Sequence, residues 1–297
     1  MTAGEPVALR PEWLQPSDTY AWAAVARNVL PVLLLLGLAP ALRVAGPVMP
    51  WLVTPLLGLF LYRVSIVMHD CGHRTLFRGA RTNDRVGRVL GALTGVDYHS
   101  FVRLHWQHHR IYGDAGDPQA FHYRGLRNLT PTRYVLHLLR PLAGLNLRYV
   151  LGESALSPKT LRRAFASGDI LTLLSVQAAV VFLVTGGGEF LALAALPFVS
   201  AATFGLFFSQ LRGIAEHATL ETPEAGHVQT HASHWADRLL LYDLHFNYHR
   251  EHHTHPQIPS CHLRAVHAAT GPGSAVRHGM LRTLVGLLRA LGARDHG

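Results

Sequence analysis

Long apolar runs alternate with polar blocks along this chain. Four runs approach the roughly 20 apolar residues that a helix needs to cross a bilayer. They cover residues 21–48, 51–68, 170–188 and 190–211. Only short linkers join the members of each pair, and the second linker is "GGGE". The pattern predicts an all-α integral membrane protein, with four transmembrane helices in two hairpins and a cytosolic helical cap.

Basic residues gather in the polar blocks. Residues 70–168 and the segment after Leu211 are rich in arginine, whereas the hairpin linkers carry Arg43 at most. The positive-inside rule therefore predicts that both blocks and both termini lie in the cytoplasm. Arg63 stands inside the second run, and we expect its side chain to extend toward the cytosolic headgroups, with a functional partner as the alternative.

We predict a single membrane domain over residues 1–297. Its parts are a polar arm (1–20), a first hairpin (21–69), interfacial helices (70–168), a second hairpin (169–211) and a cytosolic cap (212–297). The arm lacks the apolar core of a cleavable signal peptide. We expect the bacterial cytoplasmic membrane as the location, with the active site on its cytoplasmic side.

Composition supports a membrane protein and singles out one residue type. The chain is 49% hydrophobic and only 15% charged, and its net charge is +9. With such apolar runs, this charge favours a membrane surface over nucleic acid as the partner. Two cysteines without a CxxC pair predict neither a disulfide framework nor a zinc ribbon. Histidine, with 21 copies, is the outlier.

The histidines fall into sets with helical spacing. The motifs are "HDCGH", "HWQHH" and "HREHH", and a lone histidine follows the fourth apolar run. The sets are His69 and His73; His105, His108 and His109; His217; and His249, His252 and His253. Offsets of three and four place side chains on one helix face, with Cβ atoms about 5–6 Å apart. Because all sets fall just outside the apolar runs, we expect them to meet at one end of the membrane bundle.

Imidazole ligands without cysteine suit iron, copper, nickel or zinc. Eight or nine imidazoles exceed what one ion binds, so the pattern predicts two metals. Asp70, Glu216 and Glu251 stand beside box histidines, and we expect them to hold the far ring nitrogens of ligands from other helices. His245 precedes His249 by four residues, so we expect it to share that face and support the ligands. Asn247 is expected to cap or orient its neighbours.

Other polar residues near the boxes are assigned simpler roles. Asp114 and Asp117, in "GDAGDP", are interpreted as turn formers, with an orienting role for one of them as the alternative. Isolated histidines such as His99 and His122 are predicted not to be ligands.

The three boxes resemble those of the membrane fatty acid desaturase and hydroxylase family. The matching stretches are "HDCGHRTLF", "HWQHHRIYGDAGDP" and "FNYHREHHTHPQIPSCHL". The resemblance implies that the eight box histidines bind two irons, with O₂ as co-substrate. His217 is similar to the extra ligand of stearoyl-type acyl desaturases. Some members carry Asn four residues before that histidine, where this chain has Gly213.

The resemblance implies O₂-dependent desaturation of a long acyl or other aliphatic chain held among membrane lipids. No "HPGG" haem motif and no dinucleotide fingerprint occurs, so a separate ferredoxin- or rubredoxin-like donor and a reductase are expected. One alternative keeps the fold and makes the protein a hydroxylase or carotenoid ketolase. Another is a non-enzymatic membrane protein that binds metal, although a transporter would place its ligands at bilayer depth.

Overall fold

The computed structural model describes residues 9–150, 158–167, 169–220, 227–271 and 277–295, which form helices and turns without an extended strand. Three of the described helices are long and apolar enough to cross a membrane: Asp18–Ala45, Met49–Gly72 and Leu191–His217. The run at 170–188 forms only α8 (Ile170–Val184), which has 15 residues. A helix of that length spans about 22 Å, less than a hydrocarbon core of about 30 Å. Three of the four expected spans are therefore found.

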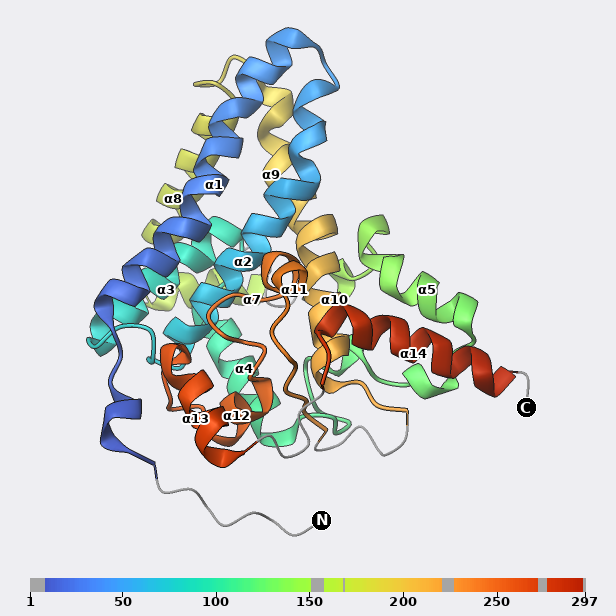
Figure 1. Ribbon diagram of the computed structural model, residues 1–297. Coiled ribbons are helices and arrows are strands. Elements are labelled where there is room, and N and C mark those ends of the chain that lie inside the picture. Colours follow the sequence, from blue (N-terminus) through green and yellow to red (C-terminus); the bar gives the residue numbers. More distant parts are fainter. Residues whose placement is uncertain (1–8, 151–157, 168, 221–226, 272–276, 296–297) are drawn as a thin grey trace.

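The long helices lie side by side and point away from the rest of the chain (Figure 1). The turn η2 (Met49–Val53) joins α1 (Asp18–Ala45) to α2 (Thr54–Gly72). The third long helix is built from η6 (Leu191–Ala195), α9 (Leu196–Ser200), the π-helical turn η7 (Ala201–Gly205) and α10 (Leu206–His217). It packs against α2, while α8 packs against α1 and α3.

Glycine permits the closest approach between these helices. A Cβ atom at Gly58 of α2 would lie 2.5 Å from the Cβ atom of Phe204 and 2.6 Å from the carbonyl oxygen of Ser200. Small residues let membrane helices bring their backbones together in this way. The contact fixes α2 against α9 and η7 of the third long helix, and both long helices end in candidate ligands.

The remaining elements form a cap at the other end of the long helices (Figure 1). Its helices are α3 (Ala80–Thr94), α4 (Tyr98–Ile111), α5 (Pro131–Leu139), α6 (Leu147–Val150), α7 (Pro158–Ser167), α11 (Trp235–Leu240), α12 (His249–Thr254), α13 (Leu263–Thr270) and α14 (Met280–Asp295). Its short 3-10 turns are η1 (Pro11–Leu14), η3 (Ala120–His122), η4 (Leu126–Asn128), η5 (Arg140–Ala143) and η8 (Ser260–His262). The Asp97 side chain caps α4 by accepting a hydrogen bond from the Ser100 N–H at 2.7 Å, which satisfies a free donor at the helix start.

The expectation that Arg63 extends to lipid headgroups is wrong. Its side chain is buried, and it donates from Nε to Asn28 Oδ1 at 2.9 Å and from Nη2 to Asp243 Oδ2 at 3.1 Å. It also donates to the backbone carbonyls of Arg238 and Leu239. A buried guanidinium needs such partners, because an unpaired charge there is costly. Arg63 thus ties α1 and α2 to the segment that leads into the third histidine box.

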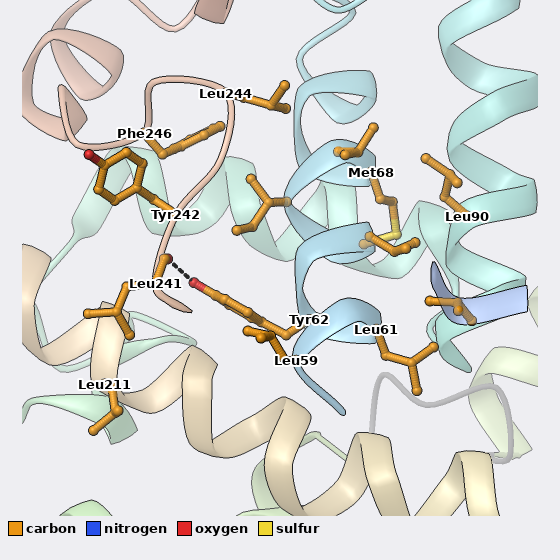
Figure 2. Packing of buried hydrophobic residues seen from close by; sticks show 14 of the residues in the cluster. Leu59, Leu61, Tyr62, Met68, Leu90, Leu211, Leu241, Tyr242, Leu244 and Phe246 are labelled. Carbon is orange, nitrogen blue, oxygen red and sulfur yellow. Dashed lines mark hydrogen bonds between the residues drawn. The ribbon is translucent and has the colours of Figure 1, made fainter. Parts of the chain in front are cut away.

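Apolar packing continues this connection. Figure 2 shows Tyr62 of α2 donating a hydrogen bond to the Leu241 carbonyl, with Tyr242 and Phe246 on the same loop. All four residues are buried in one hydrophobic cluster with the long helices. The loop before the third box is therefore held directly on α2.

Candidate metal centre

Four elements that lie far apart in the sequence bring the histidine sets together. His69 is in the last turn of α2, and His73 follows its end. The second box lies on α4, the third lies on α12, and His217 is the last residue of α10. The structure thus places all nine predicted ligands in one region at the base of the long helices.

The largest group contains five histidines, each with one ring nitrogen within 4.8 Å of the others. Its members are His69, His73, His105, His109 and His252. Nε2 of His105 lies 2.9 Å from Nε2 of His73 and 2.9 Å from Nε2 of His109. His252, from the third box, joins this group through a 3.2 Å approach to His109.

A second centre adjoins the first. Two further groups, His108 with His217 and His253, and Glu216 with His217 and His249, share His217. Nε2 of His249 lies 3.0 Å from Nε2 of His217. The rings of His109 and His253 stack at 4.2 Å and connect this centre to the five-histidine group.

The chemistry of these residues fits two metal ions. A neutral imidazole carries one N–H, so a cluster of converging nitrogens cannot be satisfied by mutual hydrogen bonds alone. Several buried ring nitrogens have no partner, among them Nε2 of His69 and both nitrogens of His253. Unpaired buried polar atoms are costly. Metal–nitrogen bonds of about 2.1 Å place neighbouring ligand atoms about 3 Å apart, which matches the observed separations.

Burial keeps the imidazoles in the form that binds metal. Desolvation lowers the pKa of His73 to about 3, and desolvation together with nearby histidines lowers the pKa of His109 to about 2. The pKa values of His105, His252 and His253 also fall well below the ordinary value, for the same reasons. Metal binding requires neutral imidazole, so these shifts prepare the site for a cation.

Asp117 contacts a candidate ligand. Its Oδ1 accepts a hydrogen bond from Nδ1 of His108 at 2.9 Å, and its Oδ2 accepts from the Gly113 N–H and the Tyr123 hydroxyl. Burial alone would raise the pKa of Asp117. The hydrogen bonds from His108, Tyr123 and the Gly113 N–H instead hold this pKa well below its usual range. Asp117 therefore both forms the turn and orients His108, which was only the alternative interpretation from the sequence.

The contacts of Asp70 and Glu216 differ from those expected. Asp70 Oδ1 lies 3.3 Å from Nδ1 of His69, its neighbour on the same helix, rather than next to a ligand from another helix. Glu216 Oε1 accepts from Arg212 Nε at 2.6 Å, while its Oε2 lies 3.4 Å from Nε2 of His249. Glu216 therefore approaches a metal-facing nitrogen rather than a far one.

Glu251 does not make the expected contact with a box histidine among the described residues. It accepts hydrogen bonds from the Thr230 hydroxyl, from Nδ1 of His267 at 2.8 Å and from Arg250 at 3.2 Å. These contacts attach α12 to α13 and to the preceding loop. Glu251 directs its carboxylate away from the rings because it lies on the opposite side of a short helix.

The helical argument for His245 is wrong. Helix α12 begins only at His249, and Leu244 and His245 adopt left-handed φ angles of 54° and 60°. The two histidines therefore do not share a helix face, and the ring of His245 lies near Tyr248. Asn247 donates from Nδ2 to the His231 carbonyl at 2.9 Å, and its backbone carbonyl accepts from the His231 N–H at 2.8 Å. It fastens an upstream segment to the third box.

The fold and the site together define a class: an all-α protein with membrane-length helices and a histidine-rich centre that can hold two metals. Comparison with known families narrows this class. The model of the family described as "Fatty acid desaturase" matches residues 45–283. The chain belongs to the fatty acid desaturase family.

Curated relatives carry related descriptions. A fatty acid desaturase of Bacillus subtilis is 25% identical over 232 residues, covering 70% of this chain and 64% of the relative. An sn-1 oleoyl-lipid 12-desaturase of Arthrospira platensis is 36% identical over 99 residues, covering 31% and 26%. An sn-2 acyl-lipid omega-3 desaturase (ferredoxin) of Helianthus annuus is 31% identical over 105 residues, covering 34% and 23%. The matches span less than two thirds of each of these relatives.

Proposed function

We propose that this protein is an O₂-dependent desaturase that forms a C=C bond in a fatty-acyl or similar aliphatic chain, with electrons supplied from outside. One observation carries the proposal. Two adjacent groups of histidine nitrogens converge from four elements at the base of membrane-length helices. Membership of the desaturase family supports the same reaction.

The ligands divide between two irons. One iron is assigned His69, His73, His105, His109 and His252, and the other is assigned His108, His217, His249 and His253. Bound iron supplies the O₂ activation that removes hydrogen from an unactivated C–H bond. The chain itself orients the ligand rings, through Asp117 on His108 and Asp70 on His69, and surrounds them with buried residues that exclude water.

We propose that α8 is a fourth, shortened span and completes a second hairpin with η6–α10. Its apolar composition and its position along α1 support this proposal. The charge bias of the sequence favours both termini and the metal centre on the cytoplasmic side of a bacterial membrane. The chain then forms one domain with the parts expected from its sequence.

The partners follow from the reaction. Lipid-linked acyl chains are the proposed substrates, because the names of two relatives specify acyl or oleoyl lipids. The description of the Helianthus annuus relative includes the word "ferredoxin", which favours a ferredoxin over a rubredoxin as donor. A separate reductase would reduce that donor.

Lipid profiling of a desaturase-deficient host tests the function. Expression of the wild-type chain should produce acyl chains that have lost two hydrogens, and the His105→Ala variant should not. A product that has instead gained one oxygen would identify a hydroxylase. A purified protein that binds one exchangeable zinc and consumes no O₂ would indicate a metal-binding protein without catalysis.

A further inference from the structure

Glu216 occupies a position unlike that of the other carboxylates of the centre. It is 3% exposed, and its Oε2 lies 3.4 Å from Nε2 of His249, the same nitrogen that lies 3.0 Å from Nε2 of His217. Asp70 and Asp117 instead contact Nδ1 atoms of their histidines. Among the described residues, Glu216 is the one carboxylate in the candidate metal-binding groups.

The separations and the charge both fit direct coordination. Ligand atoms bonded at about 2.0–2.2 Å lie about 3.0–3.5 Å from their neighbours on one ion. Two cations among neutral imidazoles also need negative charge, because burial of uncompensated charge is costly. Arg212 Nε donates a hydrogen bond to Oε1 of Glu216 at 2.6 Å. The other oxygen, Oε2, is therefore left to face the nitrogens of His217 and His249.

One turn earlier on α10, Gly213 offers no side chain to the metal-binding groups. A Cβ atom at Gly213 would lie 3.0 Å from the ring of the buried His122. We propose that Glu216 is itself a ligand of the metal bound by His217 and His249. The two metal sites are then unequal, with one bound by nitrogen alone and the other by nitrogen and a carboxylate oxygen. This inference deepens the proposed function, since it concerns the same centre.

Metal content and spectroscopy of purified variants test this assignment. Glu216→Gln should lower bound iron from about two ions per chain to about one, because the site loses an anionic ligand. Mössbauer spectra of isotopically enriched protein should lose one of two iron signals. Glu189→Gln is the matched control, since Glu189 is exposed between α8 and η6 and belongs to none of the candidate metal-binding groups, and it should retain both signals.

A double variant separates coordination from support of Arg212. Glu216→Gln alone leaves Arg212 buried without its ion-pair partner, which could disturb the fold. Arg212→Gln combined with Glu216→Gln removes both charges and should still lack the second iron signal. Two unchanged signals in either variant would overturn the assignment. Wild-type protein that binds two zinc ions and consumes no O₂ would refute the desaturase function, and the same variants would then be scored by zinc content.

A separate observation concerns the outer face of α4. Arg103, Trp106 and Arg110 recur at helical spacing and are exposed, while the second-box histidines of this helix face inward. Trp106 is 36% exposed, yet its ring centroid lies 4.8 Å from that of His73 and 5.7 Å from that of His109. One side chain therefore joins the protein surface to two rings of the five-histidine group.

The charges around Trp106 indicate the kind of partner. No carboxylate pairs with Arg103 or Arg110 among the described residues, so this face is basic. Basic rims steer acidic partners, and tryptophan and arginine are enriched among residues that dominate binding energy. We infer that an acidic one-electron carrier protein docks on Arg103, Trp106 and Arg110. It passes one electron through Trp106 to the metal centre, so two reduced carriers are oxidised for each two-electron reduction.

Binding of a plant-type [2Fe–2S] ferredoxin to the full chain in nanodiscs tests the docking surface. Arg103→Glu combined with Arg110→Glu should weaken binding at least about tenfold at low salt, and the difference should shrink at high salt. Arg133→Glu, which changes an exposed arginine on α5, is the control and should bind as wild type does. Equal binding of the double variant and the control, or no binding by wild type, would overturn the inference.

This inference rests on the proposed function, and the two can fail separately. Ferredoxin that binds in the predicted way without reducing the metals would refute the electron path but not the docking face, whereas lipid profiling of the host decides the proposed function independently. Trp106→Leu should slow reduction by ferredoxin more than reduction by dithionite, which is small enough not to need the surface. Equal slowing by both reductants would assign Trp106 a packing role only.

Discussion

Single residues outside the three boxes hold the far nitrogens of the candidate ligands. Asp117 accepts from Nδ1 of His108, and the His227 carbonyl lies 3.1 Å from Nδ1 of His217. Such contacts select the ring tautomer and the direction of the other nitrogen. The orientation of each ligand therefore depends on residues that no histidine motif contains.

Asp117→Asn should weaken metal binding by about 10–100-fold, because an amide supports the His108 imidazole less well than a carboxylate. Asp114→Asn alters an exposed residue of the same loop and should leave metal affinity unchanged. Competition with a chelator measures both affinities. Equal metal retention in the two variants would show that the hydrogen bond to His108 contributes nothing to binding.

His122 should make the stability of the metal-free protein depend on pH. Burial lowers its pKa from 6.5 to about 3, so between these values the unfolded chain binds a proton that the folded chain does not. The free energy of unfolding should therefore fall as pH falls through this window, by about 1.4 kcal/mol per pH unit from this residue. Denaturant unfolding in detergent at pH 6.5 and 4.5 measures this change. The free energy of unfolding should depend less on pH in His122→Gln than in the wild-type protein. The same dependence in both proteins would contradict this account.

At the scale of elements, short helices depend on their neighbours for position. Helix α12 has only 6 residues, and a helix this short is marginal by itself. Glu251 attaches this helix to α13. Asn247, two residues before the helix begins, attaches the chain to the segment at His231. Helix α2 and the third long helix gain their relative position from close backbone packing between Gly58 and the α9–η7 segment. The ligands on these elements are placed by packing between helices.

Gly58→Ala should destabilise the protein by about 1–3 kcal/mol, because the added methyl group overlaps the backbone of the third long helix. Gly37→Ala is the matched control on α1, where the nearest atom would be Leu183 Cδ1 at 3.6 Å, an ordinary contact. Thermal unfolding in detergent compares the two. A similar melting temperature for both variants would show that the contact at Gly58 is not tight.

For the whole molecule, the metal centre connects α2, α4, α10 and α12 at the base of the long helices. Ions held there would stabilise only the folded chain, since the ligands are dispersed when it unfolds. Removal of metal by a chelator should therefore lower the melting temperature. At a free metal concentration about 1,000 times the dissociation constant, the free energy of unfolding falls by about 4 kcal/mol for each ion removed. Restoring iron without oxygen should reverse it, and an unchanged melting temperature would contradict the proposed connection.

Residue spacing along the chain predicted many of the helices and histidine groups of this protein. Apolar runs predicted a helical membrane protein, and offsets of three and four grouped the box histidines correctly on α4 and α12. Such inferences hold because helix geometry relates residues within one turn. The same reasoning failed at His245, because the helix starts four residues later, and at 170–188, where α8 ends before a turn with left-handed glycines.

Tertiary structure alone decided how the histidines divide between the two groups. His252 joins the first-box ligands while its neighbour His253 joins His217, and Glu216 turns toward His249. The tertiary structure also pairs Arg63 with Asp243 and places Asp117 within hydrogen-bonding distance of His108. These partners lie on different elements, so their separation depends on how helices pack rather than on spacing along the chain. The sequence by itself determined which residues could bind metal, and the packing of α2, α4, α10 and α12 determined which of them meet.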